Sequence, residues 1–484
     1  MKELLKKIIT SLPEVKGPEQ KRLSFKEKLK WTLIILTGFF ILSNISLFGL
    51  SSAFENQFAQ FQIILAASFG TILSLGIGPI VTASIVLQLL NGSGIVKFDT
   101  KTPEGRAFFQ GVQKILAIFF IIFEAVVFVF IGSLAPSAAL PPSQFVLMQW
   151  FIVFQLFLGG IIVLYMDEVI NKWGFGSGIS LFIAAQVSTE IFVRAFSPLS
   201  STGTIALGAG ADPVGRVWAL IGAIFSRQLD TGFLALAAIL ATILVFVIAV
   251  YAQAMKVEIP LSFGRIRGHG IRWPLNFMYT SNIPVILIAA LLANFQLLAQ
   301  LVQNRAGEAG LLAFFSQKIL GQFVGQVPVS GLAFYLNPPN LIQEIFIGIR
   351  SGLFPFGAVG QAAVYTFILI IGSTIFSIFW VQTSGMDARS QAEQIMASGL
   401  QVPGFRRDPR VIEQILSRYI FPLTIMGGAT VGLLAATADV LGALSRGTGI
   451  LLAVMIIYKL YEEIAKDHMM DMHPSLRKVI AGGK

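Results

Sequence analysis

The 484-residue chain is 55% hydrophobic and 12% charged, and its mean hydropathy is +0.77. A soluble protein needs about 25% charged residues to cover its surface, so this composition excludes soluble, disordered and collagen-like classes and indicates a polytopic membrane protein. The net charge is +10, and the absence of cysteine excludes disulfides and thiolate metal sites.

A basic segment precedes the first long apolar run. Residues 1–30 contain nine Lys or Arg and four acidic residues, and they lack the short basic stretch and small-residue cleavage site of a signal peptide. We therefore expect a cytosolic amphipathic N-terminal segment over 1–30. Leu5 and Ile9 share one helical face, and Ser24 and Glu27 have the spacing of a capping box at the entry to the next helix.

Ten membrane-crossing segments are expected. Nine are continuous apolar runs at Trp31–Leu50, Val112–Ser133, Gln144–Met166, Ile179–Phe196, Thr231–Met255, Phe277–Leu298, Val359–Val381, Ile420–Gly442 and Gly449–Glu462. The second in chain order, from Phe61 to Leu90, is broken at Gly76–Pro79. The apolar run after Pro79 is too short to cross a bilayer, which needs about 20 apolar residues. We therefore predict a re-entrant segment followed by a half helix.

Charge placement predicts the topology. An even number of crossings places both termini on one side, and 28 of the 35 Lys and Arg fall in segments assigned to that side. The positive-inside rule then makes both termini cytosolic in a multi-pass protein of the cell membrane. Simple clustering of basic residues in long loops does not explain the bias, because the long segment 299–358 contains only three.

The crossings divide into two sets of five. An external linker at 197–230 would separate an N-terminal half at 31–196 from a C-terminal half at 231–464, and a cytosolic tail would occupy 465–484. Halves of this kind enter the membrane from opposite faces, as inverted repeats do, and interrupted helices at matching positions indicate a substrate path. The second crossing of the second half carries Pro284, which would match the break in the first half. Alternatively, Gly and Pro are simply common in membrane helices.

Five short motifs occur in order on this ten-helix map: Leu75-Gly-Ile-Gly-Pro-Ile-Val-Thr82, Gly176-Ser-Gly-Ile179, Ser281-Asn-Ile-Pro-Val-Ile286, Gly404-Phe-Arg406 and Gly447-Thr-Gly449. With these motifs the chain resembles the SecY family, the channel subunits of the Sec protein translocon, over nearly its whole length. The archaeal and eukaryotic branch fits best. Each motif alone is weak, but the ordered set is specific.

The resemblance implies an all-α polytopic membrane protein with ten transmembrane helices in two inverted, pseudo-symmetric halves and a re-entrant plug helix. The implied function is a protein-conducting channel that translocates unfolded polypeptides and releases hydrophobic segments laterally into lipid. Carried over by motif, the apolar pore ring is Ile77, Val81, Phe175, Ile179, Ile286 and Leu452. A narrow apolar ring closes to ions by dewetting. Ordinary core packing is the alternative for any one of these residues, above all for Phe175, where a smaller aliphatic residue is usual.

The resemblance also implies a plug at about 61–72. Its residues include Phe61, Ile64, Ser68 and Gly70, and a hinge at Gly76 and Gly78 would link it to the half helix. Glycine tolerates the backbone change that displacement and reseating require. An ordinary extracellular re-entrant loop remains the alternative.

We expect a single acid deep in an apolar span. Glu124 stands between Phe123 and Ala125, where an isolated charge costs ~3 kcal/mol. By resemblance it would form a polar cluster with Thr82 and Asn294 across a lateral gate. The rival interpretation, a proton-coupling carboxylate, usually needs further intramembrane charges.

Two expected cytosolic loops are basic. Phosphate-rich RNA and anionic lipids attract such clusters, and the resemblance implies that Arg265, Arg267 and Arg406 contact the ribosome or a translocation motor. Positive-inside bias explains most of the other charges. The further partners that the resemblance implies are SecE-like (gamma) and small beta subunits, signal sequences, nascent polypeptides and membrane lipid.

Enzyme chemistry has little support. The sequence contains no G-x-x-x-x-G-K-[ST] loop, and its three histidines, His269, His468 and His473, fall in expected cytosolic segments. No cofactor, metal or catalytic residue is predicted. A secondary transporter built on inverted repeats is the main alternative function, and an intramembrane protease is a weaker one, because Ser177 has no histidine base in reach.

Overall fold

The computed structural model describes residues 7, 9–20, 23–50, 70–92, 95–96, 98, 102–130, 134–136, 140–200, 213–263, 270–280, 283–305, 319–324, 327–397, 400–401 and 408–472. The chain forms two compact units. The first comprises Met1–Gln186 and Ile456–Lys484, and the second comprises Val187–Met455. The borders fall inside two helices, α7 (Gly178–Phe196) and α17 (Gly447–Met472), which therefore contribute to both units.

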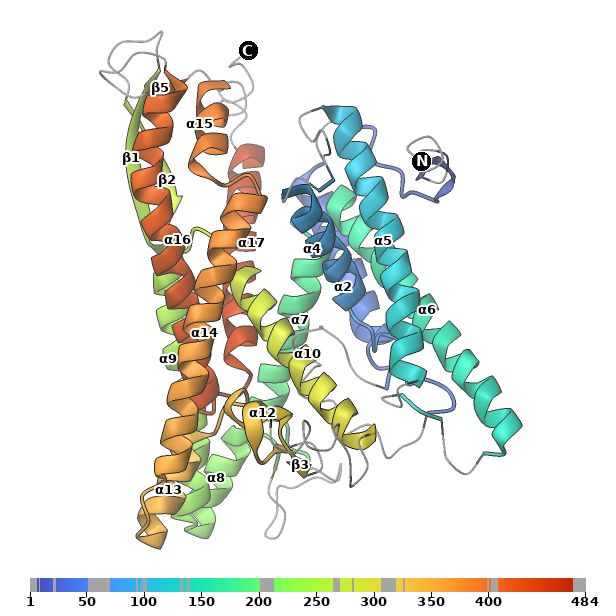
Figure 1. Ribbon diagram of the computed structural model, residues 1–484, viewed down its shortest axis with the longest axis vertical. Helices are drawn as coiled ribbons and strands as arrows, with labels where there is room; N and C mark the ends of the chain where they lie inside the picture. Colours follow the sequence, from blue (N-terminus) through green and yellow to red (C-terminus); the bar gives the residue numbers. More distant parts are fainter. Residues whose placement is uncertain are drawn as a thin grey trace. The chain divides into compact units, whose positions relative to one another are not determined.

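Helices of the first unit pack side by side. They are α2 (Phe25–Leu42), α4 (Gly78–Gly92), α5 (Pro103–Phe130), α6 (Pro142–Trp173) and the first part of α7 (Figure 1). α5 packs against both α4 and α6, and α2 packs against α6. The predicted capping residue Ser24 is confirmed, because its hydroxyl accepts a hydrogen bond from the Glu27 N–H (3.4 Å) at the start of α2.

The first predicted crossing was placed too far along the chain. α2 ends at Leu42, eight residues before the predicted end at Leu50. Ser43 and Asn44 stop the helix because their side chains hydrogen-bond the carbonyl oxygen of Phe40 (2.7 and 2.8 Å). Side chains of this kind compete with the backbone for helical hydrogen bonds.

The basic N-terminal segment lies across α5 and α6. Lys172 binds Glu14 (2.5 Å) and Glu168 (3.0 Å), and Lys114 binds Glu168 (2.8 Å) and the carbonyl oxygen of Pro13 (2.7 Å). Shared partners of this kind lower the entropy cost of each ion pair. The segment is therefore held to the first unit by a connected network.

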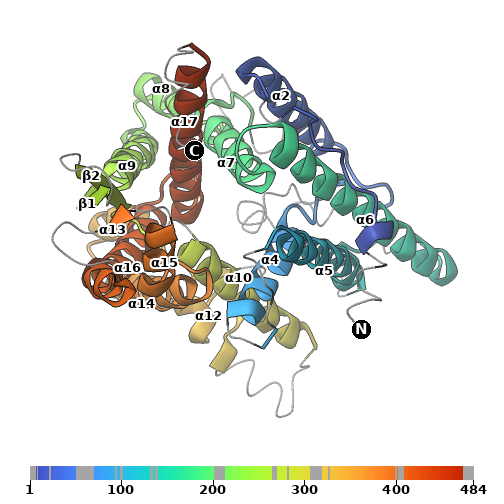
Figure 2. The ribbon, with the colours of Figure 1, turned by 90° about the horizontal axis from the view of Figure 1, so that it is seen from above.

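The second unit is a helical bundle with a small sheet. Its helices are α8 (Arg216–Ser226), α9 (Leu229–Ala254), α10 (Ile283–Arg305), α12 (Gly331–Tyr335), α13 (Leu341–Ser351), α14 (Phe356–Thr383), α15 (Ala388–Ala397) and α16 (Pro409–Val440). α14 and α16 lie side by side in both views (Figures 1 and 2). The core of this unit is formed by residues of α9, α10, α14, α16 and α17, among them Val245, Val285, Leu369, Val431 and Leu451.

A three-stranded antiparallel sheet was not predicted. β1 (Lys256–Phe263) pairs with β2 (Gly270–Asn276), with Ile259 opposite Trp273, and β5 (Leu400–Gln401) pairs with the other edge of β1. A separate two-stranded sheet joins β3 (Phe323–Val324) to β4 (Val327–Pro328). In Figure 1 the three-stranded sheet and α15 lie at one end of the second unit, and α8 and α13 lie at the other.

Six helical spans among the described residues are long and apolar enough to cross a membrane: 104–130, 142–173, 178–196, 230–254, 356–397 and 410–440. The span 356–397 comprises α14 and α15. The protein is therefore a mostly helical membrane protein with several apolar spans. Other expected crossings correspond to α2, α4, α10 and α17. Charged residues occupy the start of α2 and the end of α17, and α4 is short. The count of ten crossings stays a prediction.

Pro284 stands at a helix start, as Pro79 does in α4. We predicted a crossing at Phe277–Leu298 with the proline inside it, but α10 begins at Ile283. Pro284 therefore lies in the first helical turn, where its fixed φ suits the helix and its missing N–H has no partner to lose.

Candidate functional site

The predicted break before the half helix is confirmed. Gly70 and Gly76 have positive φ angles of 86° and 54°, and α4 begins only at Gly78. A hydrogen bond joins the turn between them to the segment that follows α2: the Ile72 N–H donates to the Ile45 oxygen (2.9 Å). Only glycine adopts such φ angles at no steric cost, so Gly70 of the predicted plug and Gly76 of the predicted hinge have a geometric role here. Gly78, the other predicted hinge glycine, is the first residue of α4. Phe61, Ile64 and Ser68 of the predicted plug lie outside the described residues.

Two residues of the predicted ring stand where α4 begins. Ile77 directly precedes the helix and is buried, and its carbonyl oxygen accepts hydrogen bonds from the Ile80 and Val81 N–H groups (3.1 and 3.0 Å). Val81 is half-buried one turn further on. The spacing of four residues places Ile77 and Val81 on one side of the helix.

Phe175 and Ile179 flank the start of α7. The Phe175 ring is buried in the first unit, with its centroid 5.4 Å from that of Phe25 and 5.5 Å from Lys28 Nζ. Ile179 is half-buried. The backbone N–H of Phe175 donates to the Thr32 hydroxyl (3.1 Å), and the backbone N–H of Ile179 donates to the carboxylate of Asp167 (2.9 Å).

The other two predicted ring residues belong to the second unit. Ile286 lies in the first turn of α10, and Leu452 lies early in α17. Every predicted ring residue is thus found at or beside the start of a helix. Because the six residues are shared between two units, the assembled ring stays a prediction.

Of the predicted polar cluster, Thr82 lies on α4 and Glu124 on α5, two helices that pack together. Asn294 belongs to α10 of the second unit. Among the described residues, none forms a hydrogen bond or ion pair with the half-buried Glu124 carboxylate. The gate cluster therefore stays a prediction.

The expectation of one intramembrane acid is wrong. Asp439 lies in α16, and Glu190 lies in α7, where it pairs with Arg194 (2.9 Å) and accepts a hydrogen bond from the Ser445 hydroxyl (3.0 Å). The Asp439 carboxylate accepts hydrogen bonds from the Gly447 N–H and the Tyr365 hydroxyl, both at 2.7 Å. Sequence reasoning also missed Thr32 and Asp167. The signal in the sequence was a polar residue near the end of an apolar run. Such a residue does not show which backbone group it binds.

The predicted docking arginines Arg265, Arg267 and Arg406 lie outside the described residues, but the strands that precede their loops are described. The loop 264–269 joins β1 to β2, and the loop 402–407 follows β5. Because Ser262 pairs with Gln401 and Phe263 with Leu400, both loops leave the same sheet.

That sheet is fixed to the bundle. Ile259 and Leu275 pack into a core with Ile395 of α15 and Leu416 of α16. The Tyr279 hydroxyl donates to the Met386 oxygen (2.7 Å), and burial, with the nearby negative charge of Asp387, raises the pKa of Tyr279 to about 12. The phenol therefore keeps its proton at physiological pH, and this anchor of the sheet persists.

Comparison with known protein families covers most of the chain. Residues 71–461 match the SecY family, and residues 39–70 match the plug domain of Sec61p. The protein translocase subunit SecY of Methanothermobacter thermautotrophicus is 46% identical over 484 residues, which cover 99% of both chains. That of Methanocaldococcus jannaschii is 41% identical over 480 residues, which cover 99% of this chain and 100% of the relative.

Comparison with solved structures gives the same result. A structure described as a protein-conducting channel has a TM-score of 0.74 and 39% identity, over 97% of this chain and 99% of the other. Sec61 in the canine ribosome-channel complex from the endoplasmic reticulum has a TM-score of 0.71 and 39% identity over the same shares. The chain therefore belongs to the SecY family and is the subunit of a protein-conducting membrane channel with a plug domain, a transporter and not an enzyme.

Proposed function

We propose that this channel conducts unfolded polypeptides through a constriction made by Ile77, Val81, Phe175, Ile179, Ile286 and Leu452. The observation that carries the proposal is their common location at or just before the starts of α4, α7, α10 and α17. The backbone that carries such a side chain belongs to a packed helix, which limits how far the side chain can move. Such a ring seals against ions when dry, yet it makes no directional bond to a passing chain.

The finer architecture that we propose is ten crossings in two inverted halves with both termini in the cytosol. The placement of elements in the second unit supports it. α8 and α13, which belong to segments expected outside, lie at the end opposite to the sheet, which belongs to loops expected inside (Figure 1). The excess of Lys and Arg on the expected cytosolic segments gives the direction.

We propose that apolar segments leave sideways between the first unit's α4 and α5 and the second unit's α10. Thr82, Glu124 and Asn294 would close this gate in the absence of substrate. Polar contacts between membrane helices are worth about 0.6 to 2 kcal/mol each. This bias is small enough for an entering signal helix to overcome, because burial of each CH₂ in lipid returns about 0.8 kcal/mol.

The proposed cytosolic partner is the ribosome, which docks on the loops 264–269 and 402–407. Support comes from the shared sheet that presents both loops and from the ribosome-bound state of the canine relative. SecE-like (gamma) and small beta subunits would complete the complex. We expect signal sequences and nascent chains as substrates.

A crosslinking experiment tests the proposed constriction. Because the chain has no cysteine, single cysteines can be placed at Ile179 and at Ile286 without a background signal. A ribosome-tethered nascent chain with one cysteine, stalled at stepped lengths, should form disulfides with both positions. Phe192 and Leu240, which are exposed on α7 and α9, serve as lipid-facing controls. Equal crosslinking at the controls, or none at Ile179 and Ile286, would refute the assignment.

A further inference from the structure

Two aspartates occupy matching places in the two halves of the chain. Asp167 of α6 accepts a hydrogen bond from the N–H of Ile179, the second residue of α7 (2.9 Å). Asp439 of α16 accepts a hydrogen bond from the N–H of Gly447, the first residue of α17 (2.7 Å). In both halves, the carboxylate comes from the helix that precedes the capped helix in the chain.

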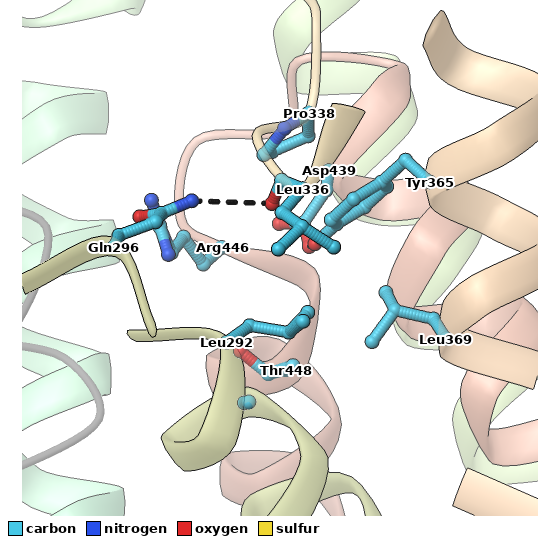
Figure 3. Close-up of a pocket in the computed structure, with 10 residues that line it drawn as sticks. Leu292, Gln296, Leu336, Pro338, Tyr365, Leu369, Asp439, Arg446 and Thr448 are labelled. Carbon is cyan, nitrogen blue, oxygen red and sulfur yellow. Dashed lines mark hydrogen bonds between the residues drawn. The ribbon is translucent and has the colours of Figure 1, made fainter. Parts of the chain in front are cut away.

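Further residues lie beside both carboxylates. Gly178 packs directly against Asp167, and Asn171 lies one turn further along α6. Asp439 accepts a hydrogen bond from the Tyr365 hydroxyl (2.7 Å), and the three residues Asp439, Tyr365 and Arg446 line one small cavity (Figure 3). Hydrogen bonds to an ionised acceptor are about twice as strong as neutral ones. Each aspartate therefore has one preferred orientation, toward the helix start.

Close packing at the two helix starts requires glycine. A Cβ on Gly178 would lie 2.7 Å from Asp167 Oδ1, and a Cβ on Gly447 would lie 2.1 Å from the Ala435 oxygen. Both distances are shorter than real Cβ contacts. A side chain at either position would push the helix start away from the neighbouring helix, so the glycine and the aspartate act together in each half.

We infer that Asp167 and Asp439 are positioning residues of the channel seal, because each fixes the helix start that carries one ring residue. That residue is Ile179 in α7 and Leu452 in α17. The inference rests on the proposed assignment of these two side chains to the constriction. A capping side chain satisfies an N–H that has no partner within its own helix. Because each cap comes from another helix, it also ties the capped helix start to that helix. In the first half the tied N–H is that of Ile179 itself, and in the second half it is that of Gly447, in the helix turn that precedes Leu452.

The consequence is a seal in which an aspartate cap holds one helix start in each half. The two caps lie in different units, so each acts on its own helix. Loss of either cap lets one helix start move, which lowers the stability of the dry closed state relative to wetted states. In the first half, the Thr32 hydroxyl provides an additional anchor at the Phe175 N–H.

Resting ion conductance of the purified channel complex in planar bilayers tests the inference. Asp167→Leu and Asp439→Leu remove the acceptor and keep a side chain that branches at Cγ, and we expect each to raise the resting conductance about tenfold, the effect of losing one charge-assisted hydrogen bond. Asp167→Asn and Asp439→Asn keep an acceptor oxygen and should restore most of the seal. If a leucine variant fails to assemble, Gly178→Ala or Gly447→Ala displaces the same helix start and keeps the carboxylate.

Matched controls separate positioning from general destabilisation. Glu168→Gln changes the neighbouring carboxylate, which binds Lys114 and Lys172 but not α7. Ser377→Ala removes the hydrogen bond from a buried hydroxyl to the Thr424 oxygen (2.9 Å) in the second unit. Leak in these two variants equal to that of the leucine variants would overturn the inference.

Different results would refute the positioning role of the aspartates and the assignment of the ring. Ile179→Ser and Leu452→Ser wet the constriction directly. If these serine variants leak and the aspartate and glycine variants do not, the ring stands and the positioning role is wrong. If the serine variants do not leak, the ring assignment itself is wrong. A spin label at Ser180 adds a local readout, and its mobility should rise in Asp167→Leu but not in Asp167→Asn.

Discussion

At the residue scale, Glu124 is a carboxylate in an apolar helix with no hydrogen-bond or ion-pair partner among the described residues. An unpaired charge at the centre of an apolar helix costs ~3 kcal/mol on insertion scales. Replacement of Glu124 with a leucine should therefore improve the insertion of α5 itself. The lateral gate is the role that we propose for this residue.

We predict that Glu124→Leu, Thr82→Val and Asn294→Leu each weaken the closed gate. Loss of ~0.6 to 2 kcal/mol of polar contact between helices lets less hydrophobic segments part them. An insertion assay with test helices of stepped leucine content should show a lower hydrophobicity threshold in each variant. Thr430→Val is the matched control, because that hydroxyl is exposed and hydrogen-bonds only the Met426 oxygen of its own helix (2.7 Å). A threshold that stays at the wild-type value in all three variants would contradict a gate role.

At the element scale, α14 and α16 form a tight pair. The Ser373 hydroxyl donates to the Gly428 oxygen (2.5 Å), and the Ser377 hydroxyl donates to the Thr424 oxygen (2.9 Å). A Cβ on Gly432 would lie 2.3 Å from Ser373 Oγ. Small residues that let helix backbones approach, together with hydroxyls that bridge them, are the usual means of association within membranes.

Two leucine substitutions should have opposite effects on this pair. Gly432→Leu forces the helices apart, and overpacking of this kind costs about 1 to 3 kcal/mol. Gly360→Leu, on α14 with no atom within 4 Å of the added Cβ, should instead be neutral or slightly stabilising, because leucine favours helix over glycine. Thermal unfolding of the detergent-solubilised complex measures both. Equal melting temperatures for the two variants would refute the packing argument.

Elements with a local cause were predictable. The capping box at Ser24 and the break at Gly76 follow from residue types that act on their own backbone. The sheet did not follow, because Pro260 and Pro274 weaken the strand pattern and Pro is unfavourable in strand interiors. The search for long apolar runs also assigned the few apolar residues of this short hairpin to a loop.

Long-range partners were not predictable. The proposed ring residues could be selected from short motifs. Asp167 and Asp439 could not, because each binds an N–H group far away in sequence: twelve residues away for Asp167 and eight for Asp439. Only a folded helix pair brings such groups together. The helix starts were displaced for the same reason, since the end of a helix depends on which side chains find its free N–H and C=O groups.

At the scale of the whole molecule, the sheet of the second unit pairs the strands that lead into two basic segments of the chain. β1 carries the loop 264–269 on one side and pairs with β5, which leads into the loop 402–407, on the other. The core beneath the sheet includes residues of α15 and α16, so the sheet is packed against the bundle. The proposed docking of the ribosome on both segments follows from this shared sheet.

We predict that Arg406→Glu, Arg265→Glu and Arg267→Glu weaken ribosome binding without unfolding the channel. Each lost phosphate contact should reduce the slope of log affinity against log salt by about 0.7 to 0.9, and Arg406 should have the largest effect because it lies in the matched Gly-Phe-Arg motif. Arg350→Glu is the control. It makes the same charge change at the other end of the second unit, where Arg350 pairs with Asp230. If binding depends only on net charge, all four variants will weaken it alike, and the docking surface does not exist. If the two loops act together, the Arg265→Glu/Arg406→Glu double variant will lose less affinity than the sum of its single losses, because the first substitution already removes part of the shared contact.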